Sequence, residues 1–275
     1  MQSLSEIRAL LAERGLRPRH RFGQNFLIEP VHLRRLVEAA EVAAGDVALE
    51  VGPGTGTLTE ELLAAGAEVV ASEIDRDLAA LVRDRFRDRI ELVEGDALAA
   101  KRSISPAIEA ALRGRPFVLV ANLPYQIASP LLANLAGDPR CSGCFVTVQR
   151  EVADRLAAAP ETSDYGPLSV VVQSRFEVEH LADLPPGCFW PPPKVTSAMV
   201  AMRPRAQPRI DFARLDAFGR FVQSVFSKRR KQLGSILGRS SSFPAGISPD
   251  VRAETITVPQ WVELFEVFSQ DGPRP

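Results

Sequence analysis

An acidic residue and three glycines follow one another closely in the segment 50–56, which reads Glu-Val-Gly-Pro-Gly-Thr-Gly. The segment stands between a short apolar run that ends at Val51 and a helical pattern that begins at Thr57. Glycines at such a turn let the backbone approach a ligand closely. A dinucleotide fingerprint needs glycine at its sixth position, but this chain has threonine there, counted from either Gly52 or Gly54, and no Gly-Lys-Ser/Thr of a phosphate-binding loop follows. Both of these nucleotide-binding patterns are therefore excluded.

The remaining pattern, acid-x-Gly-x-Gly-x-Gly, resembles the first motif of methyltransferases that use S-adenosylmethionine. That ligand has no phosphate groups, so the turn does not need a helix N-terminus arranged for anions. An ordinary glycine-rich turn from strand to helix is the alternative interpretation of this motif taken alone.

Two carboxylates follow the next two predicted strands. Glu73 ends an apolar run about 20 residues beyond the glycine turn, where a carboxylate accepts hydrogen bonds from ribose hydroxyls. Asp96 ends the following run and can accept a hydrogen bond from the amino group of an adenine. Either residue alone would more often be a helix cap or a surface charge. Together with the glycine turn they favour a nucleoside site.

The strand predicted at 117–121 is followed by Asn122, Leu123, Pro124 and Tyr125. The exocyclic amine of adenine is a poor nucleophile, because its lone pair is delocalised into the ring. The side-chain carbonyl of Asn122 and the backbone carbonyl of Leu123 can accept both amine protons and turn the lone pair towards a methyl donor. Pro124 fixes the turn, and Tyr125 can stack on the base, a contact worth roughly 1–3 kcal/mol. The alternative interpretation is that Asn-Leu-Pro-Tyr is a turn with no functional role.

No strong general base is required, since the ammonium product is acidic and releases its proton readily. Phe189 lies in the proline-rich segment 185–193 and is predicted to close the second face of the base. Extrusion of a base into such an aromatic site is how enzymes reach atoms that are hidden in a stack. A phenylalanine of the hydrophobic core is the alternative interpretation.

The elements that must position these residues alternate between short apolar strands and helical patterns. Two N-terminal helices are predicted at 5–14 and 30–40. Strands and helices then follow in turn at 46–51, 57–65, 67–73, 77–86, 90–94, 106–113, 117–121, 128–136 and 144–149. This alternation predicts an α/β fold, a Rossmann-like parallel sheet with helices on both faces. Ligands bind such sheets beyond the carboxyl ends of the strands.

The rest of the chain is predicted to change from mixed to helical structure. Further elements are expected as helices at 150–158 and 167–175, strands at 177–183 and 195–202, and helices at 212–226, 229–237, 248–254 and 259–269. The segment 185–193 is expected to be a stiff loop, because proline does not fit a central strand. We therefore predict a catalytic domain at 1–204, whose segment 1–29 covers the cofactor and binds RNA, and a small helical RNA-binding domain at 205–275.

The composition is that of an ordinary globular protein, with 275 residues of which 45% are hydrophobic and 24% charged. No apolar run is long enough to span a membrane, and charges are spread through the N-terminus where a signal peptide would have its apolar core. We expect a cytoplasmic protein without a membrane partner. Cys141 and Cys144 have zinc-like spacing, but no second pair or nearby histidine accompanies them, so we expect structural cysteines and no metal.

Positive charge is concentrated in part of the chain, although the net charge is only −1. The segment 203–239 contains ten Arg or Lys residues and two Asp residues. Such a surplus suits binding to phosphates, and a solvated helix face is the alternative. A second basic segment, at 17–27, has aromatic residues interleaved.

These motifs together resemble the ribosomal RNA adenine dimethyltransferase family over nearly the whole chain, in particular its bacterial small-subunit members. The segments that carry the resemblance are Arg21–Leu27, Glu50–Gly56, Glu73–Asp75, Gly95–Ala97, Asn122–Tyr125, Phe189–Val195 and Phe226–Lys231. The resemblance implies that S-adenosyl-L-methionine donates methyl groups to N6 of two adjacent adenosines near the 3′ end of 16S rRNA. The implied partner is this rRNA within the immature small ribosomal subunit, and we expect the enzyme to be a monomer.

Carried over residue by residue, the resemblance and the motifs predict three groups of site residues and no metal ligand. The cofactor-binding group is Gln24, Asn25, Leu27, Gly52, Gly54, Glu73, Ile74, Asp96, Ala97 and Asn122. The catalytic group is Asn122, Leu123, Pro124, Tyr125 and Phe189. The RNA-binding group is Arg19, Arg21, Lys228, Arg229, Arg230 and Lys231.

Three other functions stay open at this point. Enzymes of the macrolide-resistance type methylate large-subunit rRNA on the same fold, although the segments 191–195 and 226–231 favour the small-subunit members. A DNA adenine methyltransferase would more usually show Asp-Pro-Pro-Tyr and carry a sizeable target-reading domain, and the sequence indicates neither feature. An RNA-binding assembly or transcription factor could keep the fold without turnover, and the intact Asn122 and Tyr125 argue against it.

Overall fold

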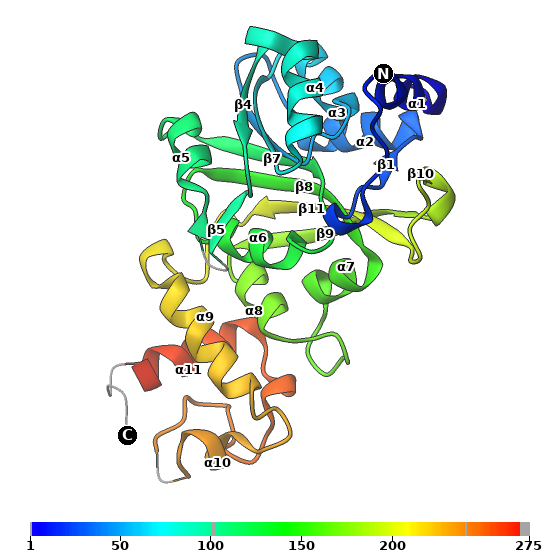
Figure 1. Cartoon of the computed structure of the whole chain (residues 1–275). Helices are drawn as coiled ribbons and strands as arrows, with labels where there is room; N and C mark the ends of the chain where they lie inside the picture. Colours follow the sequence, from blue (N-terminus) through cyan, green and yellow to red (C-terminus); the bar gives the residue numbers. More distant parts are fainter. Residues whose placement is uncertain (1, 101–102, 240, 270–275) are drawn as a thin grey trace. The chain divides into compact units, whose positions relative to one another are not determined.

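The computed structural model describes residues 2–100, 103–239 and 241–269 (Figure 1). By internal contacts the chain forms two compact units, Met1–Ala153 with Glu179–Arg203, and Asp154–Val178 with Pro204–Pro275. The third change of unit along the chain falls between Arg203 and Pro204, one residue before the boundary predicted after residue 204. Residues 154–178, which the sequence analysis assigned to the catalytic domain, group by contacts with the C-terminal residues. Residues 270–275 of the predicted helical domain lie outside the described part of the chain.

A seven-stranded sheet with the order β4-β3-β2-β7-β8-β11-β9 forms the centre of the fold. Its strands, in that order, are Ile90–Glu94, Glu68–Glu73, Val47–Val51, Phe117–Asn122, Cys141–Gln149, Ser197–Pro204 and Phe176–Leu184. The first five run parallel, as the alternation of strands and helices predicts. β11 is antiparallel to β8, with Met199 opposite Thr147. The predicted α/β fold is confirmed, and the carboxyl ends of β2, β3, β4 and β7 lie at one edge.

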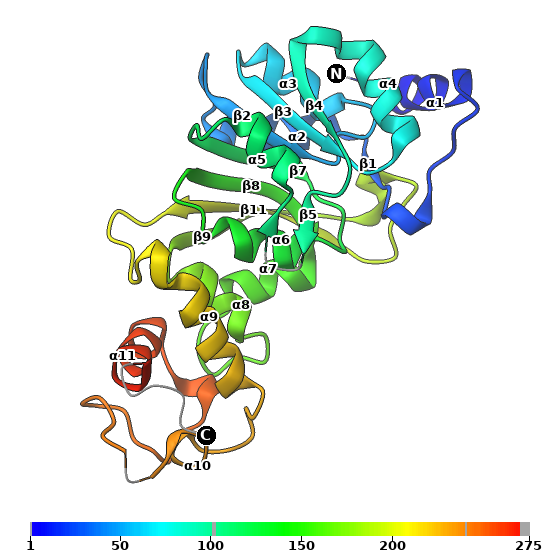
Figure 2. The ribbon, with the colours of Figure 1, turned by 60° about the vertical axis from the view of Figure 1, so that its left-hand side comes forward.

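Both faces of the central strands are buried, which explains why these strands are nearly continuous apolar runs in the sequence. Every residue of β2 is buried. Ala48, Val118 and Val120 belong to one core cluster with α2 (Pro30–Ala40), α3 (Thr57–Ala64) and α4 (Arg76–Phe86). Leu49 and Leu119, which alternate with them and are fully buried, face the other way. α5 (Pro106–Leu112) and α6 (Ala128–Leu135) contact β3, β4 and β8 there (Figure 2).

Local signals in the sequence explain where several helices begin. α1 (Leu4–Glu13) starts with a capping box, in which Ser3 and Glu6 satisfy each other's backbone N–H groups. Pro30 and Pro106 stand at the first turns of α2 and α5. Asp75 caps α4 by accepting a hydrogen bond from the N–H of Asp77.

The second unit is helical and packs around aromatic side chains. Its elements include α8 (Pro167–Gln173), α9 (Phe212–Phe226), α10 (Leu233–Leu237) and α11 (Val258–Ser269), and α7 (Arg150–Ala157) leads into it. The ring centroids of Phe226 and Trp261 are 5.2 Å apart, and the Tyr165 hydroxyl donates to the Ile256 carbonyl at 2.7 Å. Among the described residues, no helix has both the length and the apolar character that crossing a membrane demands.

Several short elements differ from the predictions. Helix α10 begins at Leu233, not at residue 229, and the predicted helix 248–254 is replaced by turns and the single 3₁₀ turn Ala253–Thr255. The proline-rich segment contains a 3₁₀ turn and β10 (Phe189–Trp190), which pairs antiparallel with β1 (Phe26–Leu27). The antiparallel pairing of β5 (Leu98–Ala100) with β6 (Ser103–Ile104) was also not predicted. Strands of two or three residues are too short to show a period in the sequence.

Gly56 gives the first prediction, because it precedes α3 with φ at 85° and a Cβ there would lie less than 3 Å from two ring carbons of Phe86. Gly114 also has positive φ, at 71°, but a Cβ there meets nothing within 4 Å. We expect Gly56→Ala to lower the free energy of unfolding by about 1–3 kcal/mol more than Gly114→Ala, since both pay for the left-handed backbone and only the first overpacks the core. Urea unfolding of the two variants measures this, and equal losses would contradict it.

Candidate active site

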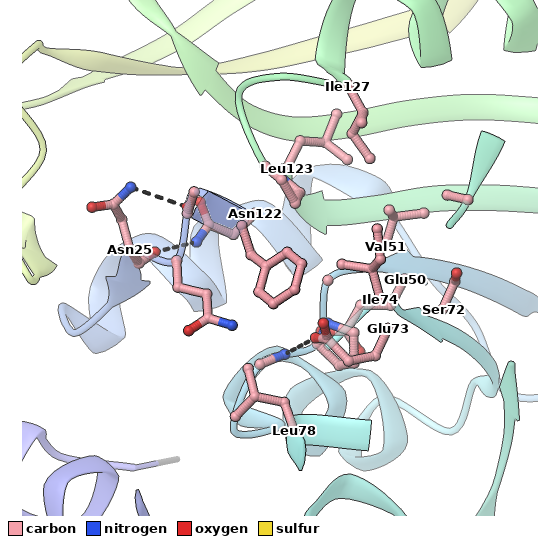
Figure 3. A pocket seen from close by; sticks show the side chains of 18 of the residues that line it. Asn25, Glu50, Val51, Ser72, Glu73, Ile74, Leu78, Asn122, Leu123 and Ile127 are labelled. Carbon is pink, nitrogen blue, oxygen red and sulfur yellow. Dashed lines mark hydrogen bonds between the residues drawn. The ribbon is translucent and has the colours of Figure 1, made fainter. Parts of the chain in front are cut away.

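A pocket in the first unit lies at the carboxyl ends of the parallel strands and under the N-terminal segment (Figure 3). All ten residues predicted to bind the cofactor line it, namely Gln24, Asn25, Leu27, Gly52, Gly54, Glu73, Ile74, Asp96, Ala97 and Asn122. Leu123, Pro124 and Tyr125 of the predicted catalytic group line it as well. Segments far apart in the sequence thus meet in one cavity, as the order of the strands requires.

The glycine turn and the tip of β7 touch each other across the pocket. A Cβ added to Gly52 would lie 3.2 Å from the Cγ atom of Pro124. β2 and β7 are neighbouring parallel strands, so the turns that follow them emerge side by side. A ligand on the glycine turn therefore lies next to the Asn-Leu-Pro-Tyr segment.

Glu73 is a buried carboxylate between these segments, with 5% of its surface exposed. Its Oε1 accepts from the N–H of Asp75 at 2.9 Å, and its Oε2 accepts from the N–H of Gly54 at 3.2 Å. Burial raises the pKa of Glu73 to about 7, and these two backbone donors oppose the rise. A carboxylate has about four acceptor positions, so two remain for donors of a ligand.

Glu50 is a second buried carboxylate, with 1% exposure, near the end of strand β2 and just before the glycines. It accepts a hydrogen bond from the Thr59 hydroxyl at 2.6 Å, which ties the strand to α3. Burial raises its pKa to about 8, and the nearby charge of Glu73 adds to the rise. Glu50 also lines the pocket, although in the sequence it stands out only as the acid of the glycine motif.

The side chain of Asn122 has a defined orientation. Its Nδ2 donates to the backbone carbonyl of Asn25 at 2.9 Å (Figure 3). Only the nitrogen of an amide can donate to a carbonyl, so Oδ1 must point away from Asn25. In the described part of the chain Oδ1 has no hydrogen-bond partner. The Leu123 N–H donates to the Thr147 carbonyl at 3.1 Å, which holds the next residue of the motif on the sheet.

Tyr125 is held by a residue that the sequence analysis missed. Its hydroxyl lies 2.6 Å from the Oγ atom of Ser197, which is fully buried at the start of β11. Burial raises the pKa of Tyr125, so the phenol stays protonated at neutral pH. A ring fixed at its hydroxyl end offers a stable face to a planar ligand. Ser197 carried no signal because it meets Tyr125 only through the pairing of distant strands.

Phe189 lies outside the pocket in this structure. Its side chain is 2% exposed and belongs to the core cluster, because β10 pairs with β1 and places Phe189 opposite Leu27. In this structure Phe189 is therefore a residue of the hydrophobic core, which was the alternative interpretation. Stacking of Phe189 on the substrate stays a prediction. The aromatic residues that line the pocket are Phe22, Phe26 and Tyr125.

The residues predicted to bind RNA fall into two groups. Lys228, Arg230 and Lys231 are exposed in the turn after α9, and Arg229 beside them pairs with Glu254 at 3.0 Å. In the N-terminal segment, the guanidinium of Arg21 lies 4.6 Å from the ring centre of Phe22. Arg19 is instead paired with two aspartates. RNA binding by all of these residues stays a prediction.

Other lining residues escaped the sequence analysis because single apolar or hydroxyl residues carry no pattern. They include Phe22, Thr55, Thr57, Ser72 and Leu78. Cys141 and Cys144 are both buried, with sulfur atoms 3.6 Å apart. Within the described ranges, no three His, Cys, Asp or Glu residues come together as a metal site.

Comparisons of the sequence with known proteins find rRNA-modifying enzymes that match nearly the whole chain. The family model described as ribosomal RNA adenine dimethylase matches residues 15–270. The ribosomal RNA small subunit methyltransferase A of Anaeromyxobacter dehalogenans is 42% identical over 274 residues, which cover 94% of this chain and 95% of the relative. The protein of the same name from Nitrosospira multiformis is 38% identical over 259 residues, which cover 92% and 97%.

Two solved structures with similar folds are, by name, a dimethyladenosine transferase and an rRNA methyltransferase. A dimethyladenosine transferase from Plasmodium falciparum has a TM-score of 0.73 and 25% identity, and the match covers 90% of this chain and 98% of that one. The 23S rRNA methyltransferase ErmE has a TM-score of 0.63 and 29% identity, with coverage of 90% and 100%. These neighbours share the sheet of methyltransferases that the sequence predicts.

The raised pKa of Glu50 gives the second prediction. Between its ordinary value of 4.5 and about 8, the folded chain keeps a proton that the unfolded chain releases, so this group lowers stability as the pH rises through that window. Glu50→Gln keeps an acceptor for Thr59 and removes the titration. Because one pKa unit corresponds to about 1.4 kcal/mol, we expect the stability of the variant relative to the native protein to grow by at least about 2 kcal/mol between pH 5 and pH 8.

Urea unfolding at pH 5, 6.5 and 8 measures this difference. Glu13→Gln, at an exposed position of α1, is the matched control and should leave the pH profile of stability unchanged. Parallel profiles for the native protein and Glu50→Gln would contradict the assignment of a buried, protonated Glu50.

Proposed function

This chain belongs to the ribosomal RNA adenine dimethylase family, and we propose that its pocket binds S-adenosylmethionine next to an extruded adenine of 16S rRNA. The enzyme transfers methyl groups to N6 of adenosines in small-subunit rRNA. The two adjacent adenosines near the 3′ end are its target, and each receives two methyl groups.

The hydrogen-bond acceptors of the pocket fit this cofactor. Glu73 offers two free acceptor positions to the ribose hydroxyls from a dry site, where such hydrogen bonds are strong. Asp96 holds the N–H of Leu98 at 3.0 Å with one oxygen and keeps the other for the adenine amine. Gly52 and Gly54 form the floor, and exposed Ile74 covers the adenine ring. When bound, S-adenosylmethionine supplies an electrophilic methyl group on its sulfonium sulfur.

The single observation that carries the proposal is the orientation of Asn122 in this shared pocket. Its nitrogen is occupied by Asn25, so its oxygen is the atom free to accept a proton of the target amine. The backbone carbonyl of Leu123 accepts the second amine proton. Both acceptors draw the nitrogen towards tetrahedral geometry and direct its lone pair at the methyl carbon. The new N–C bond forms as the C–S bond breaks, and the ammonium proton leaves to water.

We propose the rRNA of the immature small ribosomal subunit as the macromolecular substrate. The exposed cations Lys228, Arg230 and Lys231 support contacts with its phosphates. We propose that the enzyme acts as a monomer. The substrate implies that the enzyme works in the cytoplasm.

The substrate assignment is tested with labelled S-adenosylmethionine and four acceptors: immature small subunits, naked 16S rRNA, large-subunit rRNA and DNA. We expect label in small-subunit rRNA, recovered as N6,N6-dimethyladenosine by mass spectrometry of digested RNA. Label only in large-subunit rRNA or DNA would contradict the substrate. RNA binding without any label would favour a non-catalytic assembly factor.

The role of Asn122 is tested separately. We expect Asn122→Ala to lower single-turnover methylation by about 10²-fold or more, the size of the loss when one positioned polar group of an active site is removed. RNA affinity should stay within two-fold. Asn134→Ala, on α6 and outside the pocket, is the matched control for loss of an asparagine. Unchanged turnover of Asn122→Ala would remove it from the reaction.

A further inference from the structure

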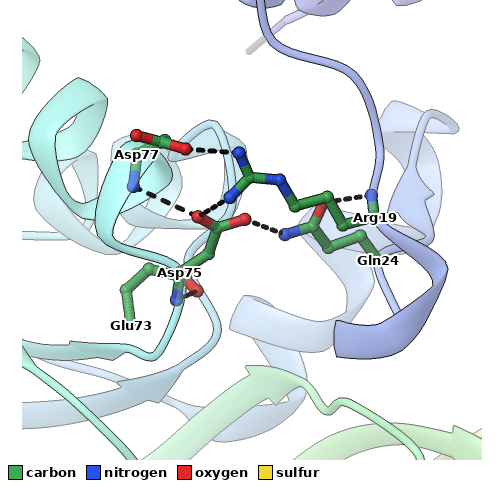
Figure 4. Close-up of polar contacts among 5 residues, drawn as sticks. All are labelled: Arg19, Gln24, Glu73, Asp75 and Asp77. Carbon is green, nitrogen blue, oxygen red and sulfur yellow. Dashed lines mark hydrogen bonds and ion pairs between the residues drawn. The ribbon is translucent and has the colours of Figure 1, made fainter.

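Arg19 makes contacts that differ from those expected of a residue held ready for RNA. Its Nη1 donates to Oδ1 of Asp75 at 2.7 Å, and its Nη2 pairs with Asp77 (Figure 4). Asp75 is only 3% exposed, so its charge is compensated by this arginine inside the protein. Removing one partner of a buried charge is strongly unfavourable, because the remaining charge is left without compensation.

Gln24 closes this network from the same segment. Its Nε2 donates to the second oxygen of Asp75 at 2.8 Å, and its Oε1 accepts from the backbone N–H of Arg19 at 2.7 Å (Figure 4). The two carboxylate oxygens of Asp75 therefore bind the side chains at both ends of the segment 19–24. Gln24 lines the pocket, but its side chain is engaged with Asp75 rather than left free for a ligand.

Asp75 also connects this network to the carboxylate that we assign to the ribose. Its own N–H donates to Oε1 of Glu73 at 2.9 Å, and its side chain caps α4. One residue thus fixes the position of Glu73 on one side and of the N-terminal segment on the other.

The same segment reaches the methyl-acceptor side of the pocket one residue later. The carbonyl of Asn25 accepts the hydrogen bond from Nδ2 of Asn122. Phe26 then lies against Gly54, so close that a Cβ on this glycine would be 2.9 Å from its ring, and it stacks on Trp190 with centroids 6.2 Å apart. We call residues 19–26 the strap, because they bridge the ends of β3 and β7 above the pocket.

We propose that Arg19 is a positioning residue whose ion pairs with Asp75 and Asp77 hold the strap, so that Asn25 orients the amide of Asn122 when the cofactor occupies the pocket. The proposal rests on the proposed function and replaces the RNA-binding role predicted for Arg19. The strap couples cofactor binding at Glu73 to the geometry of the amine acceptor at Asn122. Loss of Arg19 therefore weakens cofactor binding at Glu73 and leaves the amide of Asn122 less well oriented.

The test compares Arg19→Ala with Arg14→Ala, a matched control in which another N-terminal arginine loses its ion pair with α4, here with Asp84 at 2.8 Å. Calorimetric titration with S-adenosylhomocysteine, without RNA, measures the cofactor site. We expect Arg19→Ala to raise the dissociation constant about 10-fold and Arg14→Ala to change it less than two-fold. Arg19→Lys, which keeps the charge, should recover part of the affinity.

Asp75→Asn tests whether the two residues act together, because asparagine keeps the cap of α4 and the N–H to Glu73 but loses the ion pair. We expect the double variant Arg19→Ala, Asp75→Asn to bind no more weakly than either single variant, as for groups that act through one interaction. Hydrogen exchange of the strap amides should rise in Arg19→Ala. Single-turnover methylation at saturating cofactor should fall about 10-fold, since Asn122 is less well oriented.

Each other outcome has a distinct meaning. The proposal is overturned if Arg19→Ala has the same cofactor affinity and the same hydrogen exchange of the strap amides as Arg14→Ala. It is also overturned if Arg19→Ala keeps its cofactor affinity but loses RNA affinity, with a salt dependence of RNA binding like that of Arg21→Ala, because Arg19 would then contact RNA. A native protein that does not bind S-adenosylhomocysteine at all would instead refute the proposed function on which the strap depends.

Discussion

The hydrogen bond from the Asn122 amide to the carbonyl of Asn25 is the constraint on which the site depends, because it decides which atom of the amide faces the substrate. An amide that can rotate presents a donor as often as an acceptor, and a donor would repel the amine protons. The bond joins residues that are 97 positions apart in the sequence. It exists only because the strap crosses the carboxyl ends of the parallel strands, so the orientation of one side chain depends on the whole α/β arrangement.

Burial of two carboxyl groups is the second feature on which the site depends. Glu50 and Glu73 are nearly inaccessible to water, and burial raises the pKa of both towards or above neutrality. Burying these carboxyl groups lowers the stability of the fold. Hydrogen bonds from the backbone N–H groups of Gly54 and Asp75 and from the Thr59 hydroxyl offset part of this cost. A dry acceptor discriminates well among ligands, because a ligand without hydroxyl groups would leave it unpaired. The costly carboxylates therefore lie where recognition of a ribose is needed.

Most of the sheet and the pocket could be predicted from the sequence, since long apolar strands, helices with caps and glycine spacing carry local signals. The pairing of β1 with β10, the turn before α10 and the hydrogen bond between Tyr125 and Ser197 could not, because they depend on distant segments or on elements too short for a period. Arg19 shows the same limit. A basic residue among aromatic ones indicates RNA, and only the fold reveals that Asp75 and Asp77 lie opposite it.

The most direct test of the central claim is a crystal structure of the protein with S-adenosylhomocysteine. We expect ribose hydroxyls about 2.6–3.2 Å from the Glu73 carboxylate, the sulfur directed towards Asn122, and the hydrogen bond between Asn122 and Asn25 intact. The product bound elsewhere, or bound here with the Asn122 oxygen turned towards Asn25, would contradict it.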